Sequence, residues 1–468
     1  MKLSLALLLF IVVSIGWFLY FPSNQNQVNK SNNIYVATDG NDENPGTKTK
    51  PFRSLAKAAA EATPGTTVLI REGTYKEVLI VQHSGSEAEP IHFRPYKAEQ
   101  VILSGQNIAN EAGDTALITI EDKNHVTVSG LTIQDLTTIL NDETVMGIYV
   151  TGNSNDVVLN NNHIQRVETH ADEGNAHGIA VYGTGAIRDI TISNNTVEDL
   201  KLGTSESIVL NGNVEDFQVE GNLVRRNNNI GIDVIGYEGV ATDQSVDYAR
   251  NGLIKDNVVY QISSYSNPAY GEEYVAAGIY VDGGTDIVID NNRVYENDIG
   301  IEATSEHAAK FAENIEITNN TIYNNYYTGI AIGGYDEERG GTKNSSISHN
   351  IIYRNDTKEL GGGQLLIQHD VRDNIIEKNI LTAGPTRIFV ANYFQTVMNN
   401  KWSRNVFHYE PEKEGIWTWK DNDYTSFQAF QKVTNNDEKS KYINVVFRDE
   451  KAFDFELVKD SPTYDIVK

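Results

Sequence analysis

The chain has 468 residues, a formal net charge of -26 and no cysteine. This excess of acid argues against nucleic acid and anionic lipid as partners, because phosphates are bound by lysine and arginine on the contact face. The absence of cysteine excludes disulfides, cysteine-bound zinc and lipid attached through a thiol.

The first residues predict export. An uncharged apolar run, Leu3–Phe21, follows Lys2. Its length is nearer to that of a membrane-spanning helix than to that of a signal-peptide core, and no A-x-A-like cleavage site follows it. We expect residues 1–21 to be an uncleaved signal anchor, with a cleaved signal peptide as the alternative, and the polar residues 22–33 to be a tether. The body should therefore be extracytoplasmic, either secreted or held at the membrane by this segment alone.

The next segment predicts a cap. The Ala-rich amphipathic stretch "SLAKAAAEA", Ser54–Ala62, is typical of a short helix that covers the open end of a stack of strands. We therefore expect an N-terminal cap over about residues 34–75.

From about residue 117 onward one pattern recurs: a Gly-Ile strand, a turn, a second strand that ends in asparagine, and a third short strand. The asparagines are spaced 27 to 35 residues apart: Asn162, Asn195, Asn222, Asn257, Asn292, Asn320, Asn350 and Asn379. A single coil of this kind cannot bury its own apolar side chains, so the coils must stack. The pattern predicts an all-β fold, a right-handed parallel β-helix.

The asparagines and the C-terminal region complete this prediction. A short polar residue at a sharp corner can adopt a left-handed backbone conformation and bind its neighbours, so the asparagines should form an inner ladder. The segment Tyr424–Val433 is expected to be helical, before a last polar coil at Asp454–Val467. We expect one domain over residues 34–468, with coils at about 76–410 and a C-terminal cap at about 411–468.

Three acids fall on outward positions of successive Gly-Ile strands. When the strands are aligned coil by coil, Asp233, Asp282 and Glu302 share one side of the sheet. Coils stack about 4.8 Å apart and alternate residues lie about 6.6 Å apart, which places the Cα atom of Asp282 about 8 Å from those of the other two acids. Paired carboxylates at such distances hydrolyse glycosidic bonds, and crowding raises the pKa of at least one of them. The alternative is that they are ordinary solvated surface acids.

Long loops and aromatic residues surround these acids. Loops on a rigid scaffold commonly carry binding sites, and tyrosines beside carboxylates suit stacking against sugar rings. The candidate substrate-binding residues are Tyr182, Tyr237, Tyr280, Tyr335, Glu238, Glu306 and His307. Glu238 and Glu306 are either further acids of the site or plain surface, and His307 is either a sugar-binding or proton-relay residue or an ordinary surface histidine. His177 could hold a cation together with Asp172 and Glu173.

The segment "IYVATDGNDENPGTKTKPFRSLAKAAAEATPGTTVLIREGTY", residues 34–75, is similar to the start of exported pectate-lyase-like β-helix proteins. These include polysaccharide lyase family 9 and the β-xylosidases of glycoside hydrolase family 120. The lyases carry a paired-aspartate Ca²⁺ site before a Gly-x-Asp strand and use a lysine base. In "NNIGID", Asn228–Asp233, only the last aspartate is retained, and Asp282 stands where the lysine is expected.

The resemblance to the β-xylosidases lies at the candidate site itself. That family places an aspartate nucleophile on one outward strand and a glutamate acid/base on the next coil, followed by a histidine. "YVDGG" with Asp282 and "IEATSEH" with Glu302 and His307 resemble this order, although Gly283 replaces a tryptophan. The resemblance implies the pairing of roles and not the substrate.

The sequence therefore predicts an extracellular carbohydrate-active enzyme that hydrolyses glycosidic bonds in a neutral or weakly charged glycan without a cofactor. Asp282 would attack or orient at the anomeric carbon, Glu302 would protonate the leaving oxygen, and Asp233 would tune or bind. The first alternative is a Ca²⁺-dependent polysaccharide lyase or uronate epimerase, with the cation held by Asp233, Glu238 and Asp282. The second is a non-catalytic glycan-binding β-helix. We expect a monomer.

Overall fold

The computed structural model describes residues 32–108, 113–410, 414–435, 439–459 and 461–467. The apolar segment of residues 1–21 and the predicted tether up to residue 31 lie outside these ranges, whereas Asn32 and Asn33 already belong to strand β1 (Asn32–Val36). In the described ranges no helix is both long enough and apolar enough to cross a membrane.

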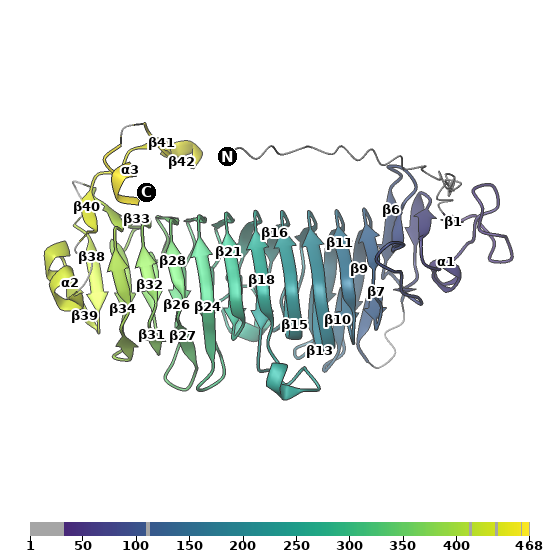
Figure 1. Ribbon diagram of the computed structural model, residues 1–468, viewed down its shortest axis with the longest axis horizontal. Helices are drawn as coiled ribbons and strands as arrows, with labels where there is room; N and C mark the ends of the chain where they lie inside the picture. The colour runs from purple at the N-terminus through teal and green to yellow at the C-terminus, as the bar shows by residue number, and fades with distance from the viewer. Residues whose placement is uncertain (1–31, 109–112, 411–413, 436–438, 460, 468) are drawn as a thin grey trace, which may run out of the picture.

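The chain winds into a right-handed parallel β-helix, as predicted, with stacked strands on three faces (Figure 1). Each complete coil runs through face A, face B and face C in turn, and in the C-terminal coils face B is formed by two short strands. Face A, which carries the candidate site, consists of β4 (Leu79–Ile80), β7 (Thr115–Glu121), β10 (Thr144–Thr151), the first parts of β13 (Asn175–Ser193) and β15 (Ile208–Glu220), β17 (Ile232–Ile235), β20 (Ala277–Asp282), β23 (Ile299–Thr304), β26 (Thr328–Ile332), β30 (Leu365–Ile367), β34 (Ile388–Asn392) and β38 (Ile416–Trp419).

Faces B and C complete each coil. Face B consists of β1, β2 (Thr66–Ile70), β5 (Ile91–Pro95), β8 (Val126–Ser129), β11 (Asn155–Asn160), the second parts of β13 and β15, β18 (Arg250–Lys255), β21 (Thr285–Asp290), β24 (Phe311–Thr318), β27 (Gly341–Lys343), β28 (Ser346–Ser348), β31 (Val371–Arg372), β32 (Ile375–Glu377), β35 (Val397–Met398) and β36 (Lys401–Ser403). Face C consists of β3 (Gly73–Tyr75), β6 (Val101–Ser104), β9 (Thr132–Thr138), β12 (His163–Thr169), β14 (Thr196–Glu198), β16 (Leu223–Asn227), β19 (Val258–Ile262), β22 (Arg293–Tyr295), β25 (Thr321–Tyr323), β29 (Ile351–Tyr353), β33 (Ile380–Thr382), β37 (Val406–His408) and β40 (Lys441–Ile443).

The Gly-Ile pattern marks the point where each coil enters face A. The inward residues at the next position lie in register and are buried: Ile148, Ile179, Ile208, Ile232, Ile279, Ile301, Ile330 and Leu365. Six of them follow a glycine, whereas Ile208 follows Ser207 and Leu365 follows Gln364. The glycine is required by close packing, because a Cβ atom on Gly278 would lie 2.8 Å from Nδ2 of Asn297 and 2.9 Å from the carbonyl oxygen of Gly300. The aliphatic columns from all three faces form one continuous core.

The predicted asparagine ladder is present at the corner between faces B and C. The backbone N–H and Nδ2 of Asn292 donate to Oδ1 of Asn320 at 2.8 and 3.0 Å, and the contact repeats from coil to coil. The predicted left-handed backbone is wrong for the ladder residues themselves. Positive φ falls on the preceding residue, for example Asn291 and Asn319, because that residue turns the corner and leaves the ladder asparagine pointing inward.

A second ladder, which the sequence pattern did not reveal, runs along the corner between faces C and A. Asn297, Asn325, Asn355 and Gln364 bind one another through backbone N–H and side-chain oxygen atoms. Its asparagines follow those of the first ladder by five residues, and Gln364 takes the next place.

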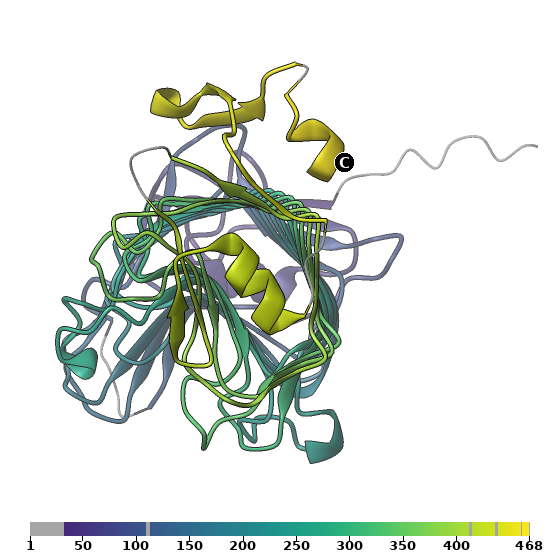
Figure 2. The same cartoon turned by 90° about the vertical axis from the view of Figure 1, so that its left-hand side faces the viewer.

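The ends of the β-helix are covered differently. Helix α1 (Leu55–Glu61), capped by Ser54, is confirmed at the N-terminal end, and α2 (Phe427–Thr434) lies across the opposite end (Figure 2). Strand β38 extends face A beyond the predicted end of the coils near residue 410, and β39 (Asn422–Tyr424) pairs with it antiparallel.

The predicted last coil at Asp454–Val467 is wrong. Strands β41 (Phe447–Asp449) and β42 (Asp454–Leu457) form an antiparallel hairpin, followed by the short helix α3 (Tyr464–Val467). This hairpin packs Phe447 and Phe455 against the outside of face C. The alternation of apolar residues is the same in a coil strand and in a hairpin strand, so the pattern could not distinguish the two.

Candidate active site

The strand register agrees with the predicted alignment of the three acids. Asp233 on β17 pairs with Tyr280 on β20, which pairs with Glu302 on β23, and Asp282 pairs with Thr304. Asp282 thus lies one strand from each of the other two acids and two residues further along. All three side chains are on the outer side of face A, since the residues between them point into the core.

These acids are nevertheless buried. Asp233, Asp282 and Glu302 are 2%, 4% and 6% exposed, because the loops that follow β17 and β23 cover this part of face A. The loop after β23 bends back over Asp282, and the backbone N–H of Glu306 donates to Asp282 Oδ1 at 2.6 Å. The sequence could place the acids on one wall but not show that the wall is roofed.

Glu206 is a fourth buried acid that the sequence pattern missed. It precedes Ser207, which takes the place of the glycine in its coil, and His177 occupies the equivalent position one coil earlier. Alignment of Ser207 with the glycines would have found it. We call Glu206, Asp233, Asp282, Glu302 and Glu306 the acid cluster. Glu306 is its exposed member, at the rim.

Burial and mutual repulsion raise the pKa values in the acid cluster. Burial, followed by the charge of Glu306, raises the pKa of Glu302 to about 8. Burial also raises the pKa of Glu206 to about 8. The pKa values of Asp233 and Asp282 are raised well above the usual range by burial and then by neighbouring carboxylates, although the N–H of Glu306 favours the charged form of Asp282.

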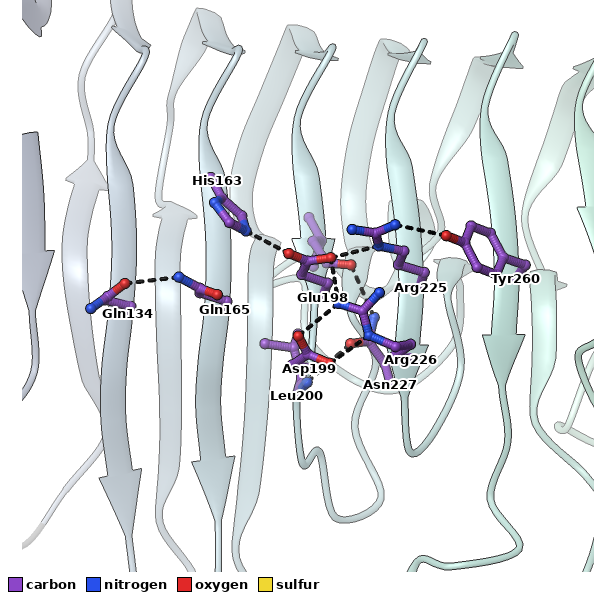
Figure 3. A network of polar contacts seen from close by, with 11 residues as sticks. Gln134, His163, Gln165, Glu198, Asp199, Leu200, Arg225, Arg226, Asn227 and Tyr260 are labelled. Atoms are coloured by element: carbon purple, nitrogen blue, oxygen red, sulfur yellow. Dashed lines mark hydrogen bonds and ion pairs between the residues drawn. The ribbon is translucent and has the colours of Figure 1, made fainter. Parts of the chain in front are cut away.

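A charged network on face C shows what a compensated acid looks like in the same fold (Figure 3). Glu198 accepts hydrogen bonds from His163 at 2.8 Å, Arg225 at 2.5 Å and Arg226 at 2.7 Å. Burial pushes its pKa upward, but Arg225 and its other partners outweigh burial, and the pKa is lowered. Among the described residues, Asp233 and Asp282 have no such partners: the strongest charge effects on them come from other carboxylates.

His177 lies beside the acid cluster as a neutral side chain. Its Nδ1–H donates to the backbone oxygen of Glu206 at 3.1 Å, and its Nε2 accepts from the hydroxyl of Tyr182 at 3.2 Å. Burial lowers its pKa to about 4. The predicted cation site with Asp172 and Glu173 is wrong, since both acids are exposed while His177 is buried.

The predicted substrate-binding residues fall into two groups: those on the strands of face A, which form the floor of the site, and those on the loops above it, which form its rim. Tyr280 is only 5% exposed, so its ring packs in the floor and cannot be the predicted stacking platform; its hydroxyl donates to Glu306 Oε1 at 3.2 Å. Tyr182 is half-buried, and its ring centroid lies 6.1 Å from that of Tyr149. These two rings form an aromatic patch next to His177.

The rim is formed by two loops that meet above Asp282. Nε2 of His307 lies 2.9 Å from Oε1 of Glu238, which joins the loop after β23 to the loop after β17. On the same loops Nζ of Lys310 lies 4.3 Å from the ring centre of Tyr237.

The third rim loop follows β26. It carries Tyr335, which is exposed and accepts a hydrogen bond from Arg339 at 2.6 Å. The predicted rim residues are therefore close to the acids, although the sequence did not predict the contacts between them.

The calcium ligands expected of a lyase do not gather in the structure. Among the described residues, no three His, Cys, Asp or Glu side chains form a group that could hold a metal ion. Glu238 is exposed and paired with His307, whereas Asp233 and Asp282 lie beneath the loops.

Comparison with known proteins places the fold among carbohydrate-active enzymes. A family model described as "Pel9A-like, right handed beta helix region" matches residues 34–201, and one described as "Right handed beta helix region" matches residues 251–431. The GH136 lacto-N-biosidase from Eubacterium ramulus has a TM-score of 0.56 at 14% identity, covering 82% of this chain and 68% of that chain. The A-module of the mannuronan C-5 epimerase AlgE4 from Azotobacter vinelandii has a TM-score of 0.51 at 15% identity, covering 76% and 91%. At such identities the likeness shows the fold alone.

Sequence relatives define the family. Pectate lyase PEL9 of Emericella nidulans is 36% identical over 83 residues, which is 17% of this chain and 20% of that protein. YwoF of Bacillus subtilis (strain 168) is 55% identical over 451 residues, which is 96% of each chain. The chain therefore belongs to the family of YwoF, and its right-handed β-helix is a fold that it shares with a lacto-N-biosidase and a mannuronan epimerase.

Proposed function

We propose that this protein hydrolyses glycosidic bonds, with Glu302 as general acid and Asp282 as the carboxylate that acts at the anomeric carbon. The observation that carries the proposal is the position of these two acids on adjacent strands of face A, two residues apart in register. Burial there raises the pKa of Glu302 to about 8. A carboxylic acid with that pKa still holds its proton at neutral pH, as a general acid must.

The two acids differ in what they contact. Asp282 accepts the backbone N–H of Glu306, which favours its charged form. For Glu302, burial and the charge of Glu306 both favour the protonated form. Burial raises the pKa of both acids, so the N–H of Glu306 is the contact that distinguishes them and assigns the anionic role in glycoside hydrolysis to Asp282.

In the proposed reaction Glu302 gives its proton to the glycosidic oxygen. The bond from that oxygen to the anomeric carbon breaks, and its electron pair stays on the leaving oxygen. Asp282 supplies negative charge to the anomeric carbon. Water finally gives its hydroxyl to the carbon and a proton back to Glu302. Asp233, which has an unpartnered oxygen, binds a sugar hydroxyl.

The lyase alternative is supported by the match of residues 34–201 to the Pel9A-like model. A β-elimination needs a base beside the reacting carbon and a cation that stabilises charge on the neighbouring carboxylate. The outward positions of face A next to the acid cluster are Val209, Asn211, Ile235, Tyr280 and Thr304, none of which is basic.

We also propose a location. Because residues 3–21 are apolar and uncharged, we place the body outside the cytoplasm, either anchored or secreted, and we propose that it is a monomer.

Incubation with a panel of glycans, followed by mass spectrometry, tests the reaction. Hydrolysis adds one water to each cleaved bond, whereas elimination leaves an unsaturated product that is one water lighter. We expect Asp282→Asn and Glu302→Gln each to lower the rate by at least about 100-fold, since general acid–base groups contribute on this scale.

Glu316→Gln is the matched control. Glu316 is an exposed acid on β24, the strand that follows β23 in the chain, and its replacement should leave the rate unchanged. Full activity of either active-site variant would refute the assigned roles. Unsaturated products would favour the lyase, and sugar binding by the wild type that yields no product and survives both substitutions would favour a binding protein.

A further inference from the structure

Among the described residues, no lysine or arginine pairs with a buried carboxyl of the acid cluster. His177, whose Nδ1 lies 3.5 Å from Oε2 of Glu206, is kept neutral by burial, which lowers its pKa to about 4. Four of its members are buried, and the charges that act on them most strongly are those of other carboxylates, either within the cluster or, for Glu206, on Glu238. A buried carboxyl is expensive unless it is paired, and Glu198 on face C shows that this fold can supply the pairing.

The nearest cations at the rim are already engaged with aromatic rings. Lys310 lies over the ring of Tyr237, and Arg339 binds Tyr335 and lies 4.8 Å from its ring centre. Both are on loops outside the acid cluster. The site is therefore built without a cation of its own among its buried side chains.

Unpartnered oxygen atoms point to a missing ligand. Buried oxygens without a hydrogen-bond partner occur on Asp233, on Asn211 of the neighbouring strand and on Asn229, in the turn before β17. Each of these residues is more than nine-tenths buried. Buried polar atoms of folded proteins normally have a hydrogen-bond partner, and a buried atom without one costs about 1–3 kcal/mol of stability.

The orientation of Asn229 makes this lack specific. Its Nδ2 donates to the backbone oxygen of Ser205 at 2.9 Å and to the hydroxyl of Tyr270 at 3.0 Å, which fixes the amide. Its oxygen is the atom that is left over. Asn211 and Asp233 each also have one side-chain oxygen without a hydrogen-bond partner. These oxygens are acceptors, so a ligand that pairs with them must supply hydrogen-bond donors.

We propose that the site takes a glycan that carries a free amine at the bound unit, such as a glucosamine unit, in preference to the N-acetylated or neutral sugar. An ammonium group supplies three N–H donors and one positive charge. It therefore satisfies the unpartnered oxygens and at the same time favours the ionised form of the neighbouring acids, whereas a sugar hydroxyl does only the first. The net charge of -26 favours the approach of a polycationic glycan over that of an anionic one.

This inference deepens the proposed function and rests on it for the site. The test uses Glu302→Gln, which removes the proposed proton donor so that ligands are not cleaved. Isothermal titration calorimetry compares chitosan oligosaccharides of glucosamine with N-acetylglucosamine oligosaccharides of equal length, in buffer with a chelator. We expect the glucosamine oligomers to bind at least about tenfold more tightly.

Two second substitutions locate the preference. In the Glu302→Gln background, Asp233→Asn should remove most of the preference for glucosamine and keep the affinity for the N-acetylated oligomer within about twofold. Glu206→Gln should act in the same direction, which keeps the test valid if one variant fails to fold. Glu316→Gln in the same background should leave the preference as it was.

The outcomes separate the two proposals. Equal affinity for the two oligomers, or an equal loss of both in Asp233→Asn and Glu206→Gln, overturns the amine preference and leaves hydrolysis of a neutral glycan standing. Binding that needs added Ca²⁺ also overturns it. Selective glucosamine binding by a protein that hydrolyses nothing in the glycan panel supports the preference and overturns the hydrolase.

Discussion

At the scale of single residues, the site holds groups that destabilise the fold. Buried carboxyls without cations raise one another's pKa, and Asp233, Asn211 and Asn229 leave oxygens unpartnered. Such groups persist where function requires them, because an enzyme accepts a local cost in stability for a prepared site. The contrast with the paired Glu198 indicates that this cost is specific to face A.

The pH dependence of stability tests this at Glu302. Its pKa is about 8 in the folded chain, against an ordinary value of 4.5. An acid whose pKa is raised on folding binds its proton more tightly in the folded chain. Its contribution to the free energy of unfolding is complete below the unfolded pKa and is lost as the pH rises from about 4.5 to about 8. The loss is on the order of a few kcal/mol. Glutamine has nearly the shape of the protonated acid and cannot ionise.

We therefore expect Glu302→Gln to melt at about the temperature of the wild type at pH 5 and several degrees above it at pH 8.5, as measured by differential scanning calorimetry. Glu316→Gln, at an exposed position, should show no such divergence. A constant difference between Glu302→Gln and the wild type across this range would show that Glu302 does not titrate as a buried acid.

At the scale of elements, the sequence predicts the coil better than the loops. Glycine, an inward isoleucine and a ladder asparagine are each required by packing within one coil, so the alignment of Asp233, Tyr280 and Glu302 could be read in advance. The cover over Asp282 depends on how the loop after β23 bends back to place the N–H of Glu306. No repeat constrains that loop, so the burial of the acids could not be predicted.

The asparagine ladder is the element that keeps this alignment. Nδ2 of Asn292 donates to the backbone oxygen of Ile254 at 2.9 Å and to Asn320, and its Oδ1 accepts from the N–H and Nδ2 of Asn257. Replacement by alanine would leave buried partners unsatisfied on both neighbouring coils. We expect Asn292→Ala to destabilise the fold by about 3 kcal/mol, measured by chemical denaturation.

The control for the ladder is Asn422→Ala. Asn422 is an exposed strand residue whose Nδ2 donates once, to the backbone oxygen of Lys420 at 2.8 Å. Its loss should cost less than about 1 kcal/mol. If the two variants were equally stable, the ladder would not stabilise the fold, and the register of face A would have to come from the aliphatic columns alone.

At the scale of the whole molecule, each coil of the β-helix contacts only its neighbours, so stability is a sum of local terms. The C-terminal hairpin is the exception. It leaves the end of the stack, lies outside it (Figure 2) and packs on face C against Tyr323 and Tyr353, of which Tyr323 belongs to the coil that carries Glu302. A solenoid pattern read along the chain predicts stacking of successive coils, and for this reason it could not predict a segment that returns over earlier ones.

Phe455 is the residue that holds the hairpin on face C. It is 4% exposed and packs against Tyr323, Tyr353 and Phe447, whereas Phe453 stacks on Tyr323 but is 37% exposed. We expect Phe455→Ala to destabilise the chain by about 3 kcal/mol and Phe453→Ala by no more than about 1 kcal/mol, because only the first opens a cavity. Limited proteolysis should then cut the Phe455→Ala variant within residues 444–459 first.

Because the hairpin packs on face C and not on the acid cluster, binding of oligosaccharide at face A should stay as in the wild type. A loss of binding in Phe455→Ala below its unfolding temperature would show instead that the hairpin and the site are coupled through the core.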